Sequence, residues 1–204
     1  MPLVRKPPSP TQAPTPDARA ISDMLATGAD EERWHAARSA AMLPDAVPLL
    51  SDALLKERVP RVREAIFTAL ASIGSPESAA VTLPYIRSDD ASQRTAALDA
   101  LRAMPAAAAV HLPGLLEDRD ADVRLLACEI ARGLPGDDAN RLLANLLERD
   151  SNPNVCAAAI EVLAEVGSSA SLEALARCGA RFPDDPFLAF AIKTAGDRIA
   201  LNNG

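Results

Sequence analysis

Residues 118–136 read DRDADVRLLACEIARGLPG, and this stretch decides the fold because its pattern recurs along the chain. Acidic residues form a turn, a Val–Arg pair follows, and a nearly apolar segment ends at Leu–Pro–Gly. Regular recurrence at a spacing of this length is typical of stacked repeats. A large apolar residue followed by Pro or Gly occurs every 30 to 32 residues, at Leu43-Pro44, Ile73-Gly74, Met104-Pro105, Leu134-Pro135 and Val166-Gly167.

A second marker keeps the same register and makes the repeat a strong signal. It consists of the pairs Glu32-Arg33, Val62-Arg63, Gln93-Arg94, Val123-Arg124 and Val155-Cys156, and a degenerate sixth copy has Leu188 and Ile199 in the matching positions. Between the two markers, apolar and small residues recur at the helical period of about 3.6. Another apolar helical segment precedes each turn, and turn aspartates such as Asp30, Asp90 and Asp120 suit helix caps. We therefore predict about six antiparallel helix pairs that share one core.

The pattern resembles the HEAT repeat, and in particular the short repeats of phycobilisome-lyase-type proteins. The best match runs from Val62-Arg63 through Ala69-Leu70 to Ile73-Gly74, and the sixth copy matches worst. The resemblance covers residues 17–202. It implies an all-α fold, a right-handed α-solenoid with first helices on the convex face and second helices on the concave face.

Composition and charge narrow the classes of protein. The chain is 49% hydrophobic but only 3% aromatic, a mix that suits closely packed helices. No apolar run reaches the roughly 18 residues of a membrane span, and the N-terminus lacks the apolar core of a secretory signal. The formal net charge of −7 disfavours nucleic acid and anionic membranes as partners. We predict a cytoplasmic protein.

The first 16 residues differ from the rest. They hold six of the 17 prolines, and Arg5 and Lys6 give them a charge of +2, so the other residues carry −9. We predict a disordered proline-rich tail at residues 1–16 and a solenoid at 17–202. The Pro-Pro-Ser-Pro sequence at 7–10 is either part of a plain solvated tail or a motif that binds a groove.

Residues that could carry chemistry are few and scattered. Cys128, Cys156 and Cys178 form no C-x-x-C pair, and the only histidines are His35 and His111, so we predict no metal site. The cysteines are either buried small hydrophobes or reactive thiols. No glycine-rich phosphate loop, Walker A or H-E-x-x-H sequence occurs, and we therefore predict no cofactor and no catalytic residue.

One arginine recurs at the same position of four successive repeats, at Arg33, Arg63, Arg94 and Arg124. Stacking would align these side chains beside the turn aspartates. They form either a ladder of ion pairs between neighbouring turns or a basic strip for an anionic ligand. The column ends at Cys156, and we expect weaker links between turns there.

The outward positions of the second helices supply the candidate binding site. An acidic row, Asp99, Glu129 and Glu161, runs beside an apolar row that includes Phe67, Leu98 and Ile160. The apolar row either packs between helices or lines a concave groove for a basic, amphipathic segment of another protein. Trp34 either seals the end of the core or anchors a partner. The predicted partner-binding residues are Trp34, Glu64, Phe67, Leu98, Asp99, Arg102, Glu129, Arg132, Ile160 and Glu161.

These observations favour a non-catalytic protein-interaction module: an adaptor, a scaffold or an assembly factor with an acidic and apolar concave face. The resemblance also implies an alternative, a subunit of a bilin lyase-type enzyme, although a widely shared fold does not fix an activity. The acidic second helices argue against nucleic-acid binding. The sequence does not identify the partner.

Overall fold

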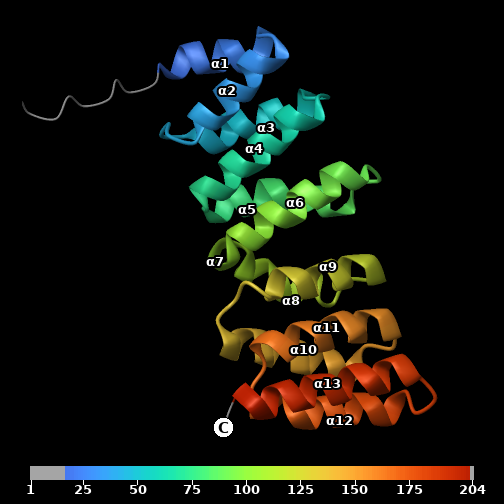
Figure 1. The fold of residues 1–204 in the computed structure, drawn as a ribbon. Coiled ribbons are helices and arrows are strands. Elements are labelled where there is room, and N and C mark those ends of the chain that lie inside the picture. The colour runs from blue at the N-terminus through green and yellow to red at the C-terminus, as the bar shows by residue number, and fades with distance from the viewer. Residues whose placement is uncertain (1–16, 203–204) are drawn as a thin grey trace, which may run out of the picture.

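The structure, a computed structural model, describes residues 17–202. Helices occupy this range in six antiparallel pairs that stack into one elongated solenoid, and the range contains no strand (Figure 1). The prediction of an all-α solenoid is confirmed. The predicted proline-rich tail at residues 1–16 lies outside the described residues.

The two members of each pair form two rows. The first row contains α1 (Ala18–Thr27), α3 (Ala46–Lys56), α5 (Pro76–Thr82) with η1 (Leu83–Arg87), α7 (Pro105–Ala108) with η2 (Ala109–His111) and α8 (Leu112–Leu115), α10 (Gly136–Arg149), and η3 (Ser169–Ser171) with α12 (Leu172–Arg181). The second row contains α2 (Asp30–Ala40), α4 (Pro60–Ile73), α6 (Ala91–Ala103), α9 (Ala121–Ala131), α11 (Pro153–Val166) and α13 (Pro186–Asn202).

Internal prolines explain why two first-row segments are divided. Pro84 and Pro113 have no backbone N–H, and each proline ring crowds the carbonyl four residues earlier. The chain responds with short 3₁₀ segments, η1 around Pro84 and η2 just before Pro113. The second helices have no proline beyond their first turn, and each runs without a break.

Most helix ends follow the predicted chemistry. The Asp90 carboxylate accepts hydrogen bonds from the amides of Ser92 and Gln93, and Asp120 caps α9 in the same way. The prediction for Asp30 is wrong because Asp30 is the first residue of α2 and pairs with Arg33 at 3.0 Å. Gly74 ends α4 with φ +62°, a conformation that favours glycine.

The core lies between the rows and continues through the stack. In α4 the predicted stripe is buried: Val62, Ala65, Ile66, Ala69 and Leu70 are at most 5% exposed. Each second helix packs along the next one from α2 to α13. The assignment of this row to the concave side stays a prediction.

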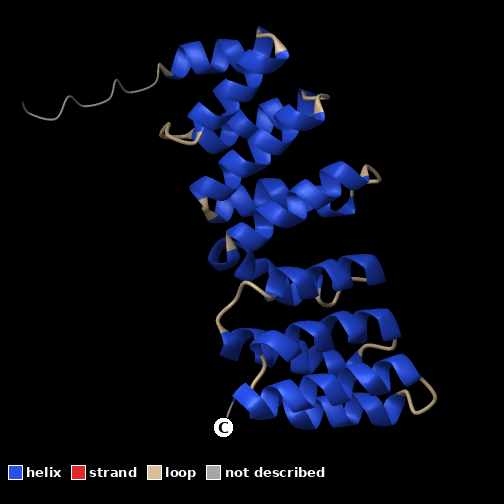
Figure 2. Cartoon of the chain, viewed as in Figure 1, coloured by secondary structure: helices blue, strands red, loops and turns tan. Residues whose placement is uncertain are grey.

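The loops form two columns, one along each edge of the solenoid (Figure 2). We call the edge with the loops inside each pair the turn edge; its loops are residues 28–29, 57–59, 88–90, 116–120, 150–152 and 182–185. We call the opposite edge, with the connections between pairs, the linker edge; its loops are residues 41–45, 74–75, 104, 132–135 and 167–168.

The recurring arginines form a ladder along the turn edge. Arg33 binds Glu57 of the next pair at 2.8 Å, Arg63 binds Asp90 at 2.9 Å, and Arg124 binds Asp150 at 2.6 Å. Arg94 differs because it donates to the Ser88 carbonyl in its own turn at 2.6 Å. The ladder interpretation is therefore confirmed at three of the four positions.

Two acceptors of the ladder are buried carboxylates. Burial alone would raise the pKa of Glu57 and of Asp150, but hydrogen bonds from arginine and from backbone amides outweigh burial and lower both pKa values. Asp118, which accepts from Arg87 at this edge, has its pKa lowered to about 2. These carboxylates are therefore ionised near neutral pH.

At the end of the arginine column, a different residue links the turns. Cys156 replaces the arginine, and its thiol donates to the Asp150 carbonyl at 3.4 Å. Arg181, from the end of α12, reaches back to the carbonyls of Leu147 (2.5 Å) and Asp150. The links between turns were expected to weaken here, but Arg181 supplies one. It binds the preceding pair, whereas the ladder arginines bind the next pair.

Polar links along the linker edge occur in the second half of the solenoid. The buried Asn140 amide donates to the carbonyls of Gly136 (2.7 Å) and Val166 (3.1 Å), and its oxygen accepts from the Ser168 amide (3.0 Å) and the Ser171 hydroxyl. Because all four of its hydrogen-bonding positions are used, Asn140 fixes the start of α10 against the end of α11.

Candidate functional site

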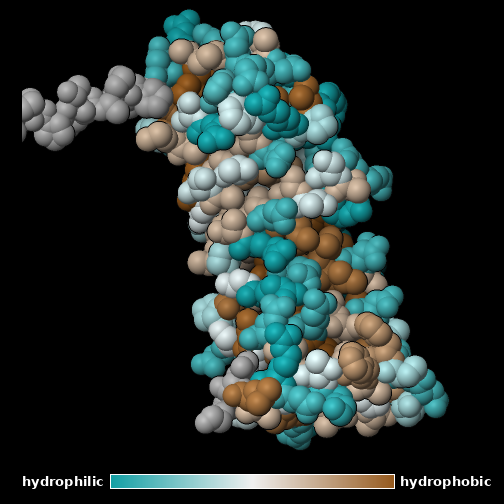
Figure 3. Space-filling view, in the orientation of Figure 1, coloured by the Kyte–Doolittle hydropathy of each residue, from teal (hydrophilic) through white to brown (hydrophobic). Residues whose placement is uncertain are grey.

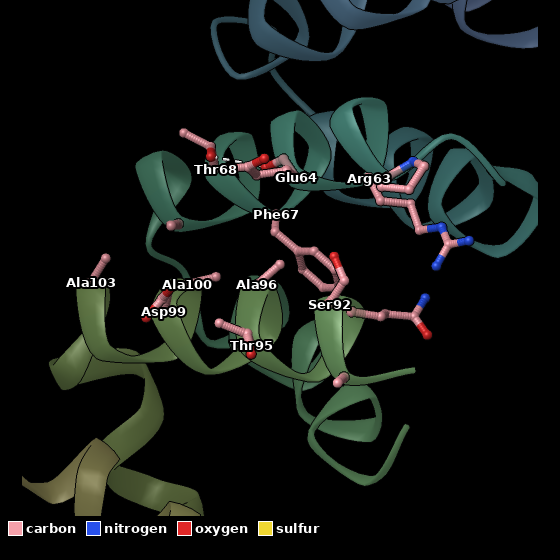
Figure 4. Close-up of a pocket in the computed structure, with 14 residues that line it drawn as sticks. Arg63, Glu64, Phe67, Thr68, Ser92, Thr95, Ala96, Asp99, Ala100 and Ala103 are labelled. Atoms are coloured by element: carbon pink, nitrogen blue, oxygen red, sulfur yellow. Dashed lines mark hydrogen bonds between the residues drawn. The ribbon is translucent and has the colours of Figure 1, made fainter. Parts of the chain in front are cut away.

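A groove runs between α4 and α6 on the face formed by the second helices, which we call the second-helix face. Its volume is about 530 Å³. In Figure 4, Phe67 points from α4 toward α6, Glu64 and Thr68 lie on the α4 wall, and Thr95, Ala96 and Asp99 lie on the α6 wall. The groove therefore extends along both helices rather than ending in a closed pocket.

Side-chain volume explains why a groove forms at this interface. The residues of α6 that line it are mostly small, namely Ala91, Ser92, Thr95, Ala96, Ala100 and Ala103. Phe67 supplies the floor, and its ring packs edge-on against Tyr85, with the ring centroids 5.4 Å apart. Small residues opposite one large aromatic leave unfilled space above the aromatic ring.

The rim of the groove carries negative charge. Glu64 and Asp99 are exposed on opposite walls, and Glu64 forms no ion pair with any described residue. Asp99 has only Arg102 nearby, at 4.0 Å in the same helix. Arg63 also lines the groove, but its guanidinium is bound to Asp90 and to the Arg58 carbonyl. The uncompensated charge that a ligand would meet is therefore acidic.

A second charged cluster lies further along the same face, around Arg132 at the end of α9. Arg132 binds Glu129 at 3.0 Å, contacts Glu165 more closely, and lies 3.8 Å from Glu161. Its hydrogen bond to Glu165 raises the pKa of Arg132 and lowers that of Glu165. Arg132 thus partly neutralises two members of the predicted acidic row, Glu129 and Glu161, whereas Glu64 at the groove has no ion-pair partner among the described residues.

The structure brings some predicted site residues together and separates others. Glu64, Phe67 and Asp99 line the groove, and Asp99, Arg102 and Arg132 line a shallow depression beside it. The prediction for Ile160 is wrong, because its side chain is 1% exposed and packs in the core. Leu98 is half-buried against the same core.

Phe67 is equally buried, with 1% of its surface exposed, but its ring still forms the groove floor. The apolar row as a whole therefore packs between helices, as one of the two interpretations stated. Sequence reasoning missed the small α6 residues and Glu165. The run of Ala, Ser and Thr in residues 91–103 is the signal that could have indicated the groove.

Trp34 lies outside the groove, on α2. The guanidinium carbons of Arg38 and Arg61 lie 4.7 and 4.6 Å from its ring centroid, and the ring is half-buried against the core. Arg61 also binds Glu31 at 2.6 Å. Trp34 therefore takes part in packing between the first two pairs, which agrees with a sealing role better than with a bare anchor.

The remaining candidates for chemistry are the cysteines, which are all buried and form no disulfide. Burial raises the pKa of Cys128 to about 12, whereas a hydrogen bond between the Cys156 and Cys178 side chains raises the pKa of Cys156 and lowers that of Cys178 to about 7. Within residues 17–202, no group of three or more His, Cys, Asp or Glu side chains could hold a metal ion. The described helices include none that is long and apolar enough to cross a membrane.

A match to a family model agrees with this architecture. A family model described as HEAT repeats matches residues 18–102 and again residues 108–193. A search of curated proteins found no match. Among solved structures, an engineered protein is 19% identical, with a TM-score of 0.44 over 90% of this chain and 96% of that chain. Human deoxyhypusine hydroxylase is 20% identical, with a TM-score of 0.43 over 89% of this chain and 83% of that chain.

Proposed function

The chain belongs to the HEAT-repeat family, and from this premise we propose that it is a non-catalytic module that binds another protein on its second-helix face. HEAT repeats generally mediate protein–protein interaction. The observation that carries the proposal is the acidic groove between α4 and α6, about 530 Å³ in volume and formed largely by small side chains. More specifically, we propose an adaptor, a scaffold or an assembly factor in the cytoplasm. The three cysteines support this location because they form no disulfide, as is usual for cytosolic proteins.

The groove favours a basic, amphipathic segment as the occupant. One or two large apolar side chains would fill the space above Phe67, where α6 presents alanine and threonine. Lysine or arginine residues that flank them would meet Glu64 and Asp99 on the two walls. Charge matching of this kind acts mainly on the association rate, whereas filling the groove slows dissociation.

The acidic cluster around Arg132 is a weaker candidate than the groove. Three carboxylates there already share one guanidinium, so a basic partner would have to compete with Arg132 for them. We therefore centre the proposed contact on Glu64 and Asp99 rather than on Glu129 and Glu161. Asp99 lies where the groove and the shallow depression meet.

The test uses a photo-cross-linking amino acid at exposed Thr95 of the full chain, in the cells that make it. The matched control places the same amino acid at exposed Ala80 on α5, in the first row. Proteins that cross-link to position 95 but not to position 80 are then purified, and their affinity is measured directly. Thr95→Trp, which fills the groove, should weaken binding about tenfold or more, whereas Ala80→Trp should not. Equal affinity for both variants would place the binding surface elsewhere.

A further inference from the structure

The last helix, α13, exposes large apolar side chains on the face that turns away from the solenoid. Phe187 is 67% exposed, Phe190 is 68% exposed and Leu201 is 81% exposed. Figure 3 shows hydrophobic side chains over both ends of this helix. Exposed apolar groups that gather on one element mark a contact surface more often than single scattered ones do.

The opposite face of α13 is already used by the fold. Leu188, Ala195 and Ile199 are at most 1% exposed and belong to the core, where α13 packs along α11 and α12. A helix with apolar residues on both faces is normally buried on both sides. The outer face of α13 therefore has the character of an interface that no described residue covers.

The N-terminal end of the solenoid shows that this exposure is not a general property of terminal helices. In α1 the exposed residues include Arg19, Asp23 and Thr27, and Met24, at 37%, is its one exposed large hydrophobic side chain. End repeats of solenoids need polar outer faces to stay soluble alone. Among the described residues, α1 presents a mostly polar outer face and α13 presents an apolar one.

We propose that the outer face of α13 binds the same face of a second copy of this chain, as an antiparallel helix pair about a two-fold axis at Thr194. Phe187 and Leu201 lie seven residues before and after Thr194, about 10 Å along the helix on either side. The two-fold operation therefore sets Phe187 of one copy opposite Leu201 of the other. The same operation sets Phe190 opposite Arg198, a pair suited to a cation–π contact.

The charges on this face also favour a second copy. Lys193 and Asp197 lie near the axis and bind each other at 3.1 Å within the helix. Lys193 and Asp197 together carry no net charge, and the two-fold axis sets Arg198 opposite Phe190 rather than opposite a like charge, so the face avoids the repulsion that the net charge of −7 on the whole chain would suggest. In the antiparallel pair, each lysine also lies close to the aspartate of the other copy. A surface that matches itself in shape and charge is what a two-fold dimer requires.

Analytical ultracentrifugation of the full chain over a range of concentrations tests the proposal. The wild-type chain should show a monomer–dimer equilibrium. Phe187→Ser with Phe190→Ser should weaken dimerisation about tenfold for each phenylalanine removed. The matched control is Met42→Ser with Val110→Ser, which removes two side chains that are 76% and 69% exposed elsewhere, and it should dimerise like the wild type. A chain that stays monomeric at about 1 mM overturns the proposal, and so does a dimer that the phenylalanine variant leaves unchanged.

A cross-link tests the axis independently of dimer strength. Under mild oxidation, Thr194→Cys should form a disulfide between two copies, because the axis brings residue 194 of one copy next to residue 194 of the other. Ala189→Cys lies on an exposed part of the same helix away from the axis and should cross-link much more slowly. The native cysteines are fully buried, so the wild-type chain is a clean blank. Equal rates for the two variants would contradict the proposed pairing.

Discussion

The two halves of the solenoid share one repeat and one core but are held together differently. Along the turn edge, ion pairs link neighbouring pairs of helices in both halves, as Arg33–Glu57 and Arg124–Asp150 illustrate. Along the linker edge, Arg132–Glu165 and the Asn140 network add polar links in the second half. Among the described residues, no side-chain hydrogen bond or ion pair joins different helix pairs at this edge between α1 and α6. Repeats of equal length can therefore be linked to their neighbours by different numbers of polar contacts.

The difference matters because the groove lies in the half that is linked at one edge. Between α4 and α6 the polar contact is the Arg63–Asp90 ion pair at the turn edge, and the rest of the contact is side-chain packing. Between α9 and α11, Arg132 binds Glu165 near the far ends of the two helices. The proposed binding groove thus lies at an interface with one polar link between its second helices.

Substitution of a core leucine should cause the largest loss of stability, and the loss should be the same in both halves because the core is continuous. Leu50 in α3 and Leu163 in α11 are both fully buried. Leu50→Ala and Leu163→Ala should each lower the free energy of unfolding by roughly 2–5 kcal/mol. Urea denaturation measures both. A cost below about 1 kcal/mol for either one would mean that one half is loosely packed.

Loss of a buried ladder carboxylate should come next and should again affect both halves. Glu57→Ala removes the buried carboxylate that Arg33 binds in the next pair and leaves Arg33 with the exposed Asp30, and Asp150→Ala removes the buried carboxylate that Arg124 binds, so each should cost about 3 kcal/mol. Denaturant melts of the two variants beside Glu31→Ala, an exposed control, measure the difference. A negligible cost at one position would show that the ladder supports only the other half.

The same carboxylates predict a pH dependence. The folded pKa values of Glu57, Asp118 and Asp150 lie below their ordinary values, so their stabilising contribution is complete above about pH 5. It should be lost as the pH falls through the folded pKa values, toward about 2 for Asp118. Stability measured between pH 6 and pH 2 should therefore decrease, and Glu57→Gln should make the decrease smaller. A flat profile would contradict the lowered pKa values.

A smaller effect should distinguish the halves. Asn140→Ala removes the buried amide that links Gly136, Val166, Ser168 and Ser171, at a cost of about 2 kcal/mol. Asn145→Ala on the exposed side of α10 is the control and should be nearly neutral. Hydrogen exchange should show faster opening in residues 136–171 of the Asn140 variant, while exchange in α2 and α4 stays unchanged. Uniformly faster exchange would mean that the two halves unfold as one unit.

The smallest expected effect is on the groove itself. Asp99 is exposed, with one distant pair to Arg102, so Asp99→Lys should change stability by less than about 0.5 kcal/mol. Glu129→Lys should cost more, because Glu129 binds Arg132 at 3.0 Å and is partly buried. Thermal melts of the two variants side by side check this order. The reverse order would show that Asp99 supports the fold rather than a binding surface.

The sequence predicted the features that depend on spacing alone. Two markers in register indicated the six pairs, and one recurring arginine indicated the ladder, because stacked copies bring equal positions together. It did not predict the depth at which Phe67 and Ile160 lie, since burial depends on the volumes of residues on two facing helices. It also missed the ion pair of Arg132 with Glu165 and the contacts of Arg181, because no regular spacing reveals these partners.

The single linked edge of the first half has a mechanical consequence. Because one ion pair, Arg63–Asp90 at the turn edge, links α4 and α6, we expect only side-chain packing to oppose a small rotation of the two helices about that edge. Such a rotation changes the width of the groove and breaks no ladder bond. We therefore expect the first half to be more deformable than the second, so that segments of different size can bind in the groove.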